Sequence, residues 1–184
     1  SGKAVDEFKT LVRELHKNGI AVILDVVYNH VSQYDENSLK YTDYDFYFKK
    51  EVNTGCGNEI ESRRPMARRL ILDSVKYWMT EYKIDGFRFD LAGCHDVETI
   101  KLIKEEMLKI NPKAFIIAEP WTAGKSVSTK TDFIKNGWSY WNDGIRGTVR
   151  GDNRPIKESK SFMLGNAYNA IKLSDYWKGT SGGS

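Results

Sequence analysis

The chain has 184 residues, enough for one domain with a buried core, and its hydrophobic (40%) and charged (29%) fractions are ordinary for a globular protein. The net charge of +3 is small and spread along the chain, and no basic stripe is interleaved with aromatics, so we expect no nucleic-acid partner. No apolar run of about 18 residues predicts a membrane span, and no signal peptide is visible at the start. The two cysteines form neither a CxxC pair nor a disulfide framework.

The first third of the chain predicts a helix, a buried strand and a long loop. Apolar residues recur at helical spacing over residues 5–18, and Gly19 ends that helix. Residues 20–27 form a short apolar run rich in β-branched side chains, which is typical of a strand buried on both faces of a parallel sheet. The polar, aromatic stretch 29–64 is too long for an ordinary connection, so we expect a functional loop there.

The remainder alternates between helical and strand patterns. Pro65 occupies a first-turn position and opens the next helix, which runs to about Lys83. Strands alternating with helices predict βαβ units and a parallel sheet. The further strands are expected at 84–90, 114–119 and 138–141, and the further helices at 96–110 and 128–136.

Two fold families fit this order, the doubly wound sheet and the eight-stranded barrel. No G-x-G-x-x-G or Walker loop follows any strand, which counts against a nucleotide-binding sheet. Polar residues instead follow the strands at their carboxyl ends, where a (β/α)8 barrel places its chemistry. They are Asp25 with Asn29 and His30, then Asp90, Glu119, and Asn142 with Asp143.

A complete barrel has eight strands in about 250 residues, and this chain predicts four. We therefore expect an α/β fold that is a partial (β/α)8 TIM barrel of about four βα units. It would occupy residues 1–153. Residues 154–184 have no assigned fold, and 179–184 resemble a flexible linker.

Two carboxylates at successive strand ends are the main candidates for chemistry. Arg88 lies two residues before Asp90, on the same side of the strand, and should keep that carboxylate ionised, as suits a nucleophile. Glu119 precedes Pro120 and Trp121, and a carboxyl group near such apolar side chains tends to hold its proton, as suits a general acid. Taken singly, each could equally be a strand-end cap or half of an ion pair.

Three motifs at the predicted strand ends point to a family. DVVYNH at 25–30, DGFRFD at 85–90 and AEPW at 118–121 resemble signature regions of the α-amylase superfamily (glycoside hydrolase family 13), in the right order. Their spacing is similar to that of the family's third, fourth and fifth barrel strands. The four predicted strands would then correspond to barrel strands 3–6.

Finer features resemble one branch of that family. TGCGNE at 54–59, RPMAR at 64–68 and DLAGCHD at 90–96 look like the pullulanases and isoamylases, which are starch-debranching enzymes. The resemblance covers roughly residues 4–153.

The resemblance implies roles for individual residues. Asp90 would be the nucleophile, Glu119 the acid/base and Arg88 the residue that orients Asp90. The residues implied to bind or line the sugar site are His30, Tyr28, Trp121, Asp25 and His95. For Tyr28 and Trp121 the alternative is packing at the barrel rim, for His30 a structural hydrogen bond, and for His95 capping of the next helix. No cofactor is required, although Asn29 matches a calcium ligand of some amylases.

The function implied is a retaining glycoside hydrolase acting on α-1,6 branch linkages of α-glucans such as pullulan, glycogen or starch dextrins. No histidine follows Glu119, so the family's seventh-strand His-Asp element is missing and we expect the 184-residue chain alone to be inactive. Two alternatives are a non-catalytic or engineered barrel fragment, which would self-associate through open barrel edges, and another amylase-family activity such as α-1,4 hydrolysis or transglycosylation. A secreted, periplasmic or cytoplasmic bacterial location would each fit.

Overall fold

The computed structural model describes residues 2–32, 37–51, 54, 56–122 and 124–150. The predicted tail from residue 154, with its linker-like end, lies outside these ranges. No helix among the described residues has the length and apolar character needed to cross a membrane. In chain order the elements are α1 (Gly2–Lys17), β1 (Ile23–Val26), β2 (His30–Val31), α2 (Ser38–Tyr47), β3 (Asn58–Glu59), α3 (Pro65–Glu81), β4 (Gly86–Phe89), a 3-10 turn (Ala92–Cys94), α4 (Val97–Ile110), β5 (Phe115–Ala118), α5 (Lys130–Lys135), β6 (Ser139–Tyr140) and α6 (Asp143–Arg150).

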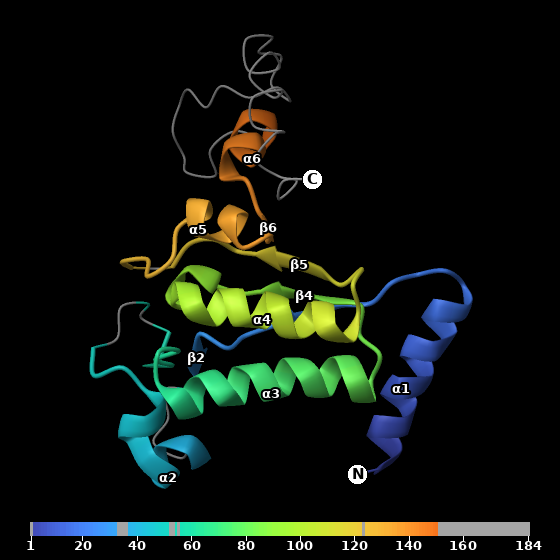
Figure 1. Ribbon diagram of the computed structural model, residues 1–184, viewed down its shortest axis with the longest axis horizontal. Coiled ribbons are helices and arrows are strands. Elements are labelled where there is room, and N and C mark those ends of the chain that lie inside the picture. The colour runs from blue at the N-terminus through green and yellow to red at the C-terminus, as the bar shows by residue number, and fades with distance from the viewer. Residues whose placement is uncertain (1, 33–36, 52–53, 55, 123, 151–184) are drawn as a thin grey trace.

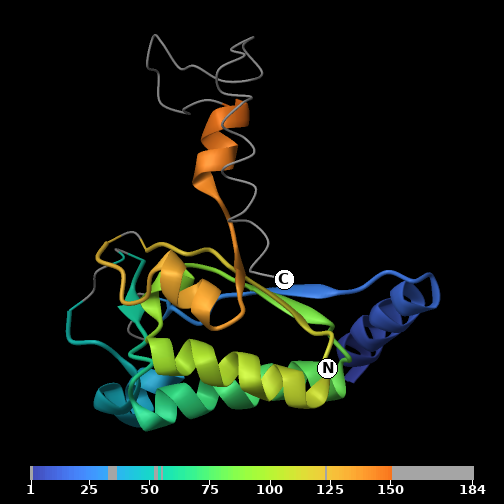
Figure 2. The ribbon, with the colours of Figure 1, turned by 45° about the horizontal axis from the view of Figure 1, so that its top comes forward.

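The central sheet has four strands in the order β1-β4-β5-β6, and every neighbouring pair is parallel. Strands that follow each other as βαβ units are thus also neighbours in space. Figures 1 and 2 show that α3 and α4, which connect β1 to β4 and β4 to β5, lie side by side on the same face of the sheet. A doubly wound sheet places helices on both faces, whereas a barrel keeps them outside. The arrangement is that of part of a barrel, as predicted.

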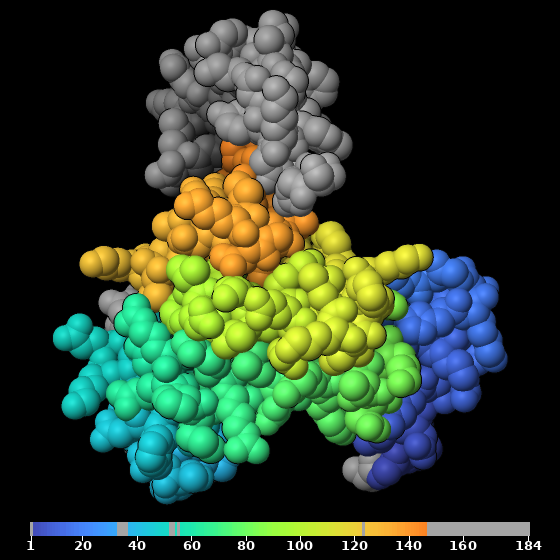
Figure 3. Space-filling view, in the orientation of Figure 1, coloured from blue at the N-terminus to red at the C-terminus, as the bar shows by residue number. Residues whose placement is uncertain are grey.

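The core lies between the sheet and the helices. In β4 the side chains of Phe87 and Phe89 are fully buried, and they belong to one apolar cluster with Ile71 and Val75 of α3. Figure 3 shows α3 and α4 as a continuous outer layer of side chains over this core, with α1 at one end. Period-two alternation buries the phenylalanines and leaves Arg88 on the opposite face.

The opposite face of the sheet would be the barrel interior, and here it is partly exposed. Ile23 and Phe115 keep 40% and 46% of their surface accessible. They are register partners on either side of Gly86. A side chain at Gly86 would meet them at once, because an added Cβ would lie 2.1 Å from the Phe115 carbonyl oxygen and 2.9 Å from Ile23 Cδ1.

The described residues of segment 29–64, where a long functional loop was expected, contain helix and strand. They include α2, whose first turn is capped by the Asn37 side chain accepting from the Leu39 N–H. They also include an antiparallel pair, β2 with β3, that places His30 opposite Glu59. Glu59 is buried and forms an ion pair with Lys49. Lys49 Nζ also donates to the Cys94 carbonyl at 3.5 Å, which ties this segment to the turn after β4.

Candidate active site

Arg88 is the centre of a charged cluster at the carboxyl end of the sheet. Its Nη1 donates to Asp25 Oδ1 at 2.9 Å and to Asp90 Oδ1 at 2.8 Å, while Nη2 lies 3.2 Å from Glu119 Oε2. Burial by itself lowers the pKa of Arg88, but the bonded carboxylates of Asp25 and Asp90 outweigh it and raise the pKa. One guanidinium therefore holds three carboxylates from three neighbouring strands on one rim, and the predicted contact between Arg88 and Asp90 is present.

Asp90 follows β4 directly and is held from two sides. Besides Arg88, the Asn29 side chain donates to the Asp90 carbonyl at 2.8 Å and to its Oδ2 at 3.2 Å. Burial alone would raise the pKa of Asp90, but the hydrogen bonds with Arg88, Asn29 and Glu119 outweigh it, so the pKa lies below its ordinary value. Asp90 is therefore ionised near neutral pH, as a carboxylate nucleophile must be.

Glu119 follows β5 and is only 14% exposed at its side chain. The Leu91 backbone N–H donates to Glu119 Oε2 at 3.0 Å, and the Ala92 N–H donates to the Glu119 carbonyl at 2.8 Å. The turn after Asp90 thus bonds to the turn that begins at Glu119. Gly93 permits this approach, because a Cβ there would lie 3.0 Å from the Trp121 carbonyl carbon.

Asn29 and His30 complete the rim on the β1 side. Asn29 is fully buried. Its side-chain oxygen contacts His30 Nδ1, and its amide nitrogen donates to the Asp90 carbonyl. His30 is half-buried at the start of β2. No group of three acidic, His or Cys side chains in the described ranges could hold a metal ion. The role of Asn29 as a calcium ligand stays a prediction.

Tyr28 does not line the cleft, which corrects its predicted role. Its ring packs on Phe89 at 5.7 Å between centroids, and it belongs to the apolar layer between sheet and helices. Burial raises its pKa, and hydrogen bonds with Ser74 and Trp78 of α3 oppose the rise. Successive side chains of a strand point to opposite faces. Tyr28 comes two residues after the buried Val26 and points to the same face, whereas Asp25 points to the face that carries Arg88.

His95 is also placed away from substrate, which corrects its predicted binding role. Its side chain is fully buried and meets the Phe89 ring edge to face at 6.2 Å. Within the described part of the chain, neither ring nitrogen has a hydrogen-bond partner. Burial lowers the pKa of His95 to about 4, with Lys49 adding to the effect. The cap of α4 is Asp96, which accepts from the Thr99 N–H at 3.2 Å.

Two aromatic residues border the carboxylates on the β6 side. Trp121 is partly exposed, and its ring lies 6.5 Å from that of Trp141. Trp141 in turn covers Arg88, with the guanidinium carbon 4.5 Å from its ring centroid. Sequence reasoning placed Trp141 only in a short strand and assigned Leu91 no role. The signal for Trp141 was its position just before the polar pair Asn142 and Asp143, at a strand end.

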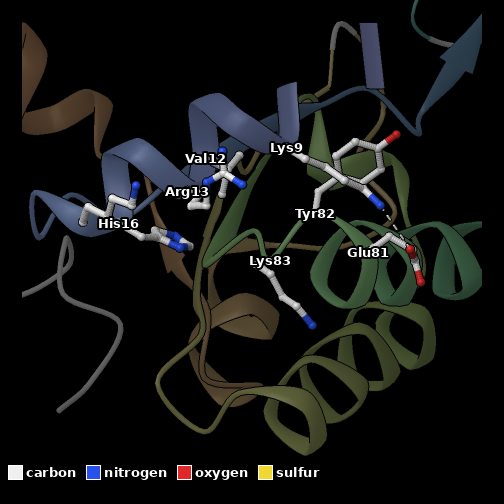
Figure 4. A pocket seen from close by; sticks show the side chains of 8 residues that line it. Lys9, Val12, Arg13, His16, Glu81, Tyr82 and Lys83 are labelled. Atoms are coloured by element: carbon white, nitrogen blue, oxygen red, sulfur yellow. Dashed lines mark hydrogen bonds and ion pairs between the residues drawn. The ribbon is translucent and has the colours of Figure 1, made fainter. Parts of the chain in front are cut away.

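A second hollow lies at the other end of the strands and takes no part in this site. It has a volume of about 420 Å³ and lies between α1 and the end of α3 (Figure 4). Its basic side chains are Lys9, Arg13, His16, Lys17 and Lys83. Lys9 pairs with Glu81 at 3.3 Å and His16 with Asp85 at 2.7 Å. His16 and Lys17 lie in the last turn of α1, where basic residues offset the helix dipole.

Comparisons with known proteins agree with this geometry. The family described as "Alpha amylase, catalytic domain" matches residues 3–60. The chain is 35% identical over 188 residues to the pullulanase of Bacillus subtilis, covering 96% of this chain and 26% of that protein. It is 38% identical over 175 residues to the chloroplastic isoamylase 3 of rice, Oryza sativa, covering 81% of this chain and 22% of that protein.

Solved structures give the same result in three dimensions. The crystal structure of the pullulanase from Anoxybacillus sp. LM18-11 complexed with maltotetraose superimposes with a TM-score of 0.83 at 33% identity. The match covers 92% of this chain and 26% of that one. The chain thus spans about a quarter of the length of these relatives. It belongs to the α-amylase superfamily, in the branch of the pullulanases and isoamylases, and corresponds to part of their catalytic barrel.

Proposed function

We propose that this chain supplies the catalytic carboxylates of a retaining glycoside hydrolase that cleaves α-1,6 branch linkages in α-glucans such as pullulan, glycogen or starch dextrins. The observation that carries the proposal is the binding of Asp90 and Glu119 by the two terminal nitrogens of one guanidinium, at adjacent strand ends. Retaining glycosidases need two carboxyl groups about 5 to 5.5 Å apart. The relatives named pullulanase and isoamylase support the choice of debranching over other activities of the family.

In the first step Glu119, protonated, donates its proton to the glycosidic oxygen while a carboxylate oxygen of Asp90 attacks the anomeric carbon. The bond from that carbon to the leaving oxygen breaks, and a covalent ester between the sugar and Asp90 forms. Asp90 suits this role because its lowered pKa keeps it ionised. Glu119 suits the other because it is largely buried beside the nucleophile.

In the second step Glu119, now a carboxylate, takes a proton from a water molecule that attacks the same carbon. The ester bond breaks, Asp90 leaves as a carboxylate, and the product keeps the original anomeric configuration. Trp121 and His30 would contact the sugar, since both are partly exposed at the rim. No step requires a cofactor.

The test is a reducing-sugar assay on pullulan, with the protein that carries this sequence inside a complete barrel. We expect turnover that Asp90→Ala abolishes while maltotriose binding persists. Turnover that survives Asp90→Ala would refute the assignment. The 184-residue chain by itself should show no turnover, because catalysis also needs transition-state contacts beyond the carboxylate pair. If the isolated chain showed turnover, and Asp90→Ala abolished it, the prediction that this chain is inactive alone would be wrong.

For the isolated 184-residue chain we propose a second property, self-association. The exposed face with Ile23 and Phe115, and the edge positions of β1 and β6 in the four-stranded sheet, support this. Unpaired strand edges offer free backbone donors and acceptors to another chain.

A further inference from the structure

Trp141 lies in the same row as the two carboxylates. The Asp90 N–H donates to the Val26 carbonyl, the Glu119 N–H to the Phe89 carbonyl and the Trp141 N–H to the Ala118 carbonyl, at 3.0, 2.9 and 3.0 Å. Each bond continues the parallel ladder by one residue past the end of a strand. Asp90, Glu119 and Trp141 therefore stand side by side at one level, on the face that carries Arg88.

The contact between Trp141 and Arg88 is specific in geometry. The guanidinium carbon lies 4.5 Å from the indole centroid, within the range of a cation–π interaction. The edge of the guanidinium, through Nη1 and Nη2, holds Asp90 and Glu119. The ring thus covers one face of the cation, while the polar edge stays free for the carboxylates.

Arg88 needs such support. Its Nε atom is buried and has no hydrogen-bond partner in the described part of the structure. Only the contacts of the terminal nitrogens and the indole ring then set the rotation of the guanidinium plane. Three carboxylates compete for this one cation, and Asp25, with a side chain 67% exposed, could draw it out of the site.

We propose that Trp141 is a positioning residue, whose indole holds the Arg88 guanidinium flat across the Asp90–Glu119 pair so that one cation serves both carboxylates. The effect of Trp141 on catalysis rests on the proposed function, but its contact with Arg88 can be tested without any enzymatic activity. Trp141 acts through Arg88 and is not itself assigned a contact with substrate.

The alternative role is a stacking platform for sugar, since Trp141 is 41% exposed and Trp121 lies beside it. The two roles predict different effects. A platform changes saccharide affinity and leaves Arg88 unaffected, whereas a positioning residue changes the environment and mobility of Arg88 in the absence of any sugar.

The experiment is NMR on the 184-residue chain, comparing wild type with Trp141→Leu, Trp141→Phe and, as a control, Tyr77→Leu. Tyr77 is an exposed aromatic residue on α3, on the outer side of the sheet and away from Arg88. The ring of Trp141 should shift the Arg88 Hε resonance upfield and slow rotation of the guanidinium. We expect Trp141→Leu to remove both effects and to raise the Asp90 pKa, because the hydrogen bond from Arg88 weakens. Trp141→Phe should restore most of them, and Tyr77→Leu should change none.

An Arg88 resonance and an Asp90 titration that are unchanged in Trp141→Leu would overturn the proposal, and so would equal changes in Tyr77→Leu. Circular dichroism of each variant confirms that the fold is kept, and Trp141→Met, which also lacks an aromatic ring, replaces Trp141→Leu if that variant unfolds. The NMR results do not depend on turnover, so a negative pullulan assay would refute the proposed function without changing the conclusion about Trp141. In an active protein, Trp141→Leu should lower kcat far more than it raises KM, whereas loss of a platform would raise KM.

Discussion

The backbone N–H of Leu91 donates to Glu119 Oε2 at 3.0 Å from a left-handed conformation, with φ 39° and ψ 46°. A non-glycine residue rarely adopts this region, and such residues concentrate at functional sites, where the surrounding structure maintains the strain. The turn that follows the proposed nucleophile therefore orients the proposed acid. Its conformation couples the ends of β4 and β5.

This bond predicts that the Leu91 amide proton reports the ionisation of Glu119. We expect its NMR resonance to move downfield as Glu119 loses its proton, because a charged acceptor makes a stronger hydrogen bond. Glu119→Gln should abolish the titration while leaving the fold intact. The Leu39 amide, bonded to the neutral side chain of Asn37, is the internal control. A flat Leu91 resonance in the wild-type protein would contradict the bond.

Removal of the Arg88 guanidinium should damage turnover more than binding. In the protein with a complete barrel, we expect Arg88→Ala to lower kcat by about 10² to 10³, the range for loss of one preorganised stabiliser. KM should change little, because Arg88 contacts carboxylates of the protein rather than an exposed surface. Arg69→Ala is the matched control, since Arg69 is exposed on α3 and pairs with Asp73 of the same helix at 3.3 Å. Equal effects of the two substitutions would refute the role.

Burial of His95 predicts a loss of stability in mild acid. Its pKa is about 4 in the folded state and about 6.5 in an unfolded chain, so the unfolded state binds the proton first. Because the folded state disfavours protonation of His95, the protein keeps its full stability above pH 6.5 and loses stability as the pH falls toward 4. Between pH 7 and pH 4.5 we expect this group to cost roughly 2 to 3 kcal/mol in the free energy of unfolding.

Urea unfolding of the dilute chain at several pH values measures this effect. His95→Gln should flatten the pH dependence over that interval. Met107→Leu, at another fully buried position without a titrating group, should lower stability while keeping the wild-type slope. An unchanged slope in His95→Gln would mean that other groups cause the acid sensitivity.

The exposed face of the sheet predicts association of the isolated chain. We expect light scattering to show dimers or larger species of the 184-residue protein. Phe115→Lys should shift them toward monomers, because burying an unpaired charge in the contact is unfavourable. Tyr77→Lys is the control, since Tyr77 is 51% exposed on α3, on the outer side. A monomeric wild-type chain that unfolds cooperatively would contradict this prediction.

The sequence alone determined the order of the βαβ units and the ends of the strands at which polar residues collect. Periodicity predicted α3 and α4 within about two residues and all four strands of the central sheet, because burial against one neighbouring layer imposes a regular pattern. The helix α6 and the ordered elements inside residues 29–64 were not predicted. The elements inside 29–64 are held by contacts such as the Lys49–Glu59 pair, which periodicity does not display.

The residues of the site also divide into those that the sequence identified and those that only the structure placed. Motif residues Asp90, Glu119 and Arg88 could be named from the sequence, since each sits at or near a strand end. The parity of Tyr28 with Val26 is local, but only the tertiary structure decided that His95 is buried and that Trp141 covers Arg88. The physical reason is that a side chain's direction after a strand depends on the turn that follows and on tertiary partners, as Trp141 depends on Arg88, whereas the strand itself is specified by its local pattern.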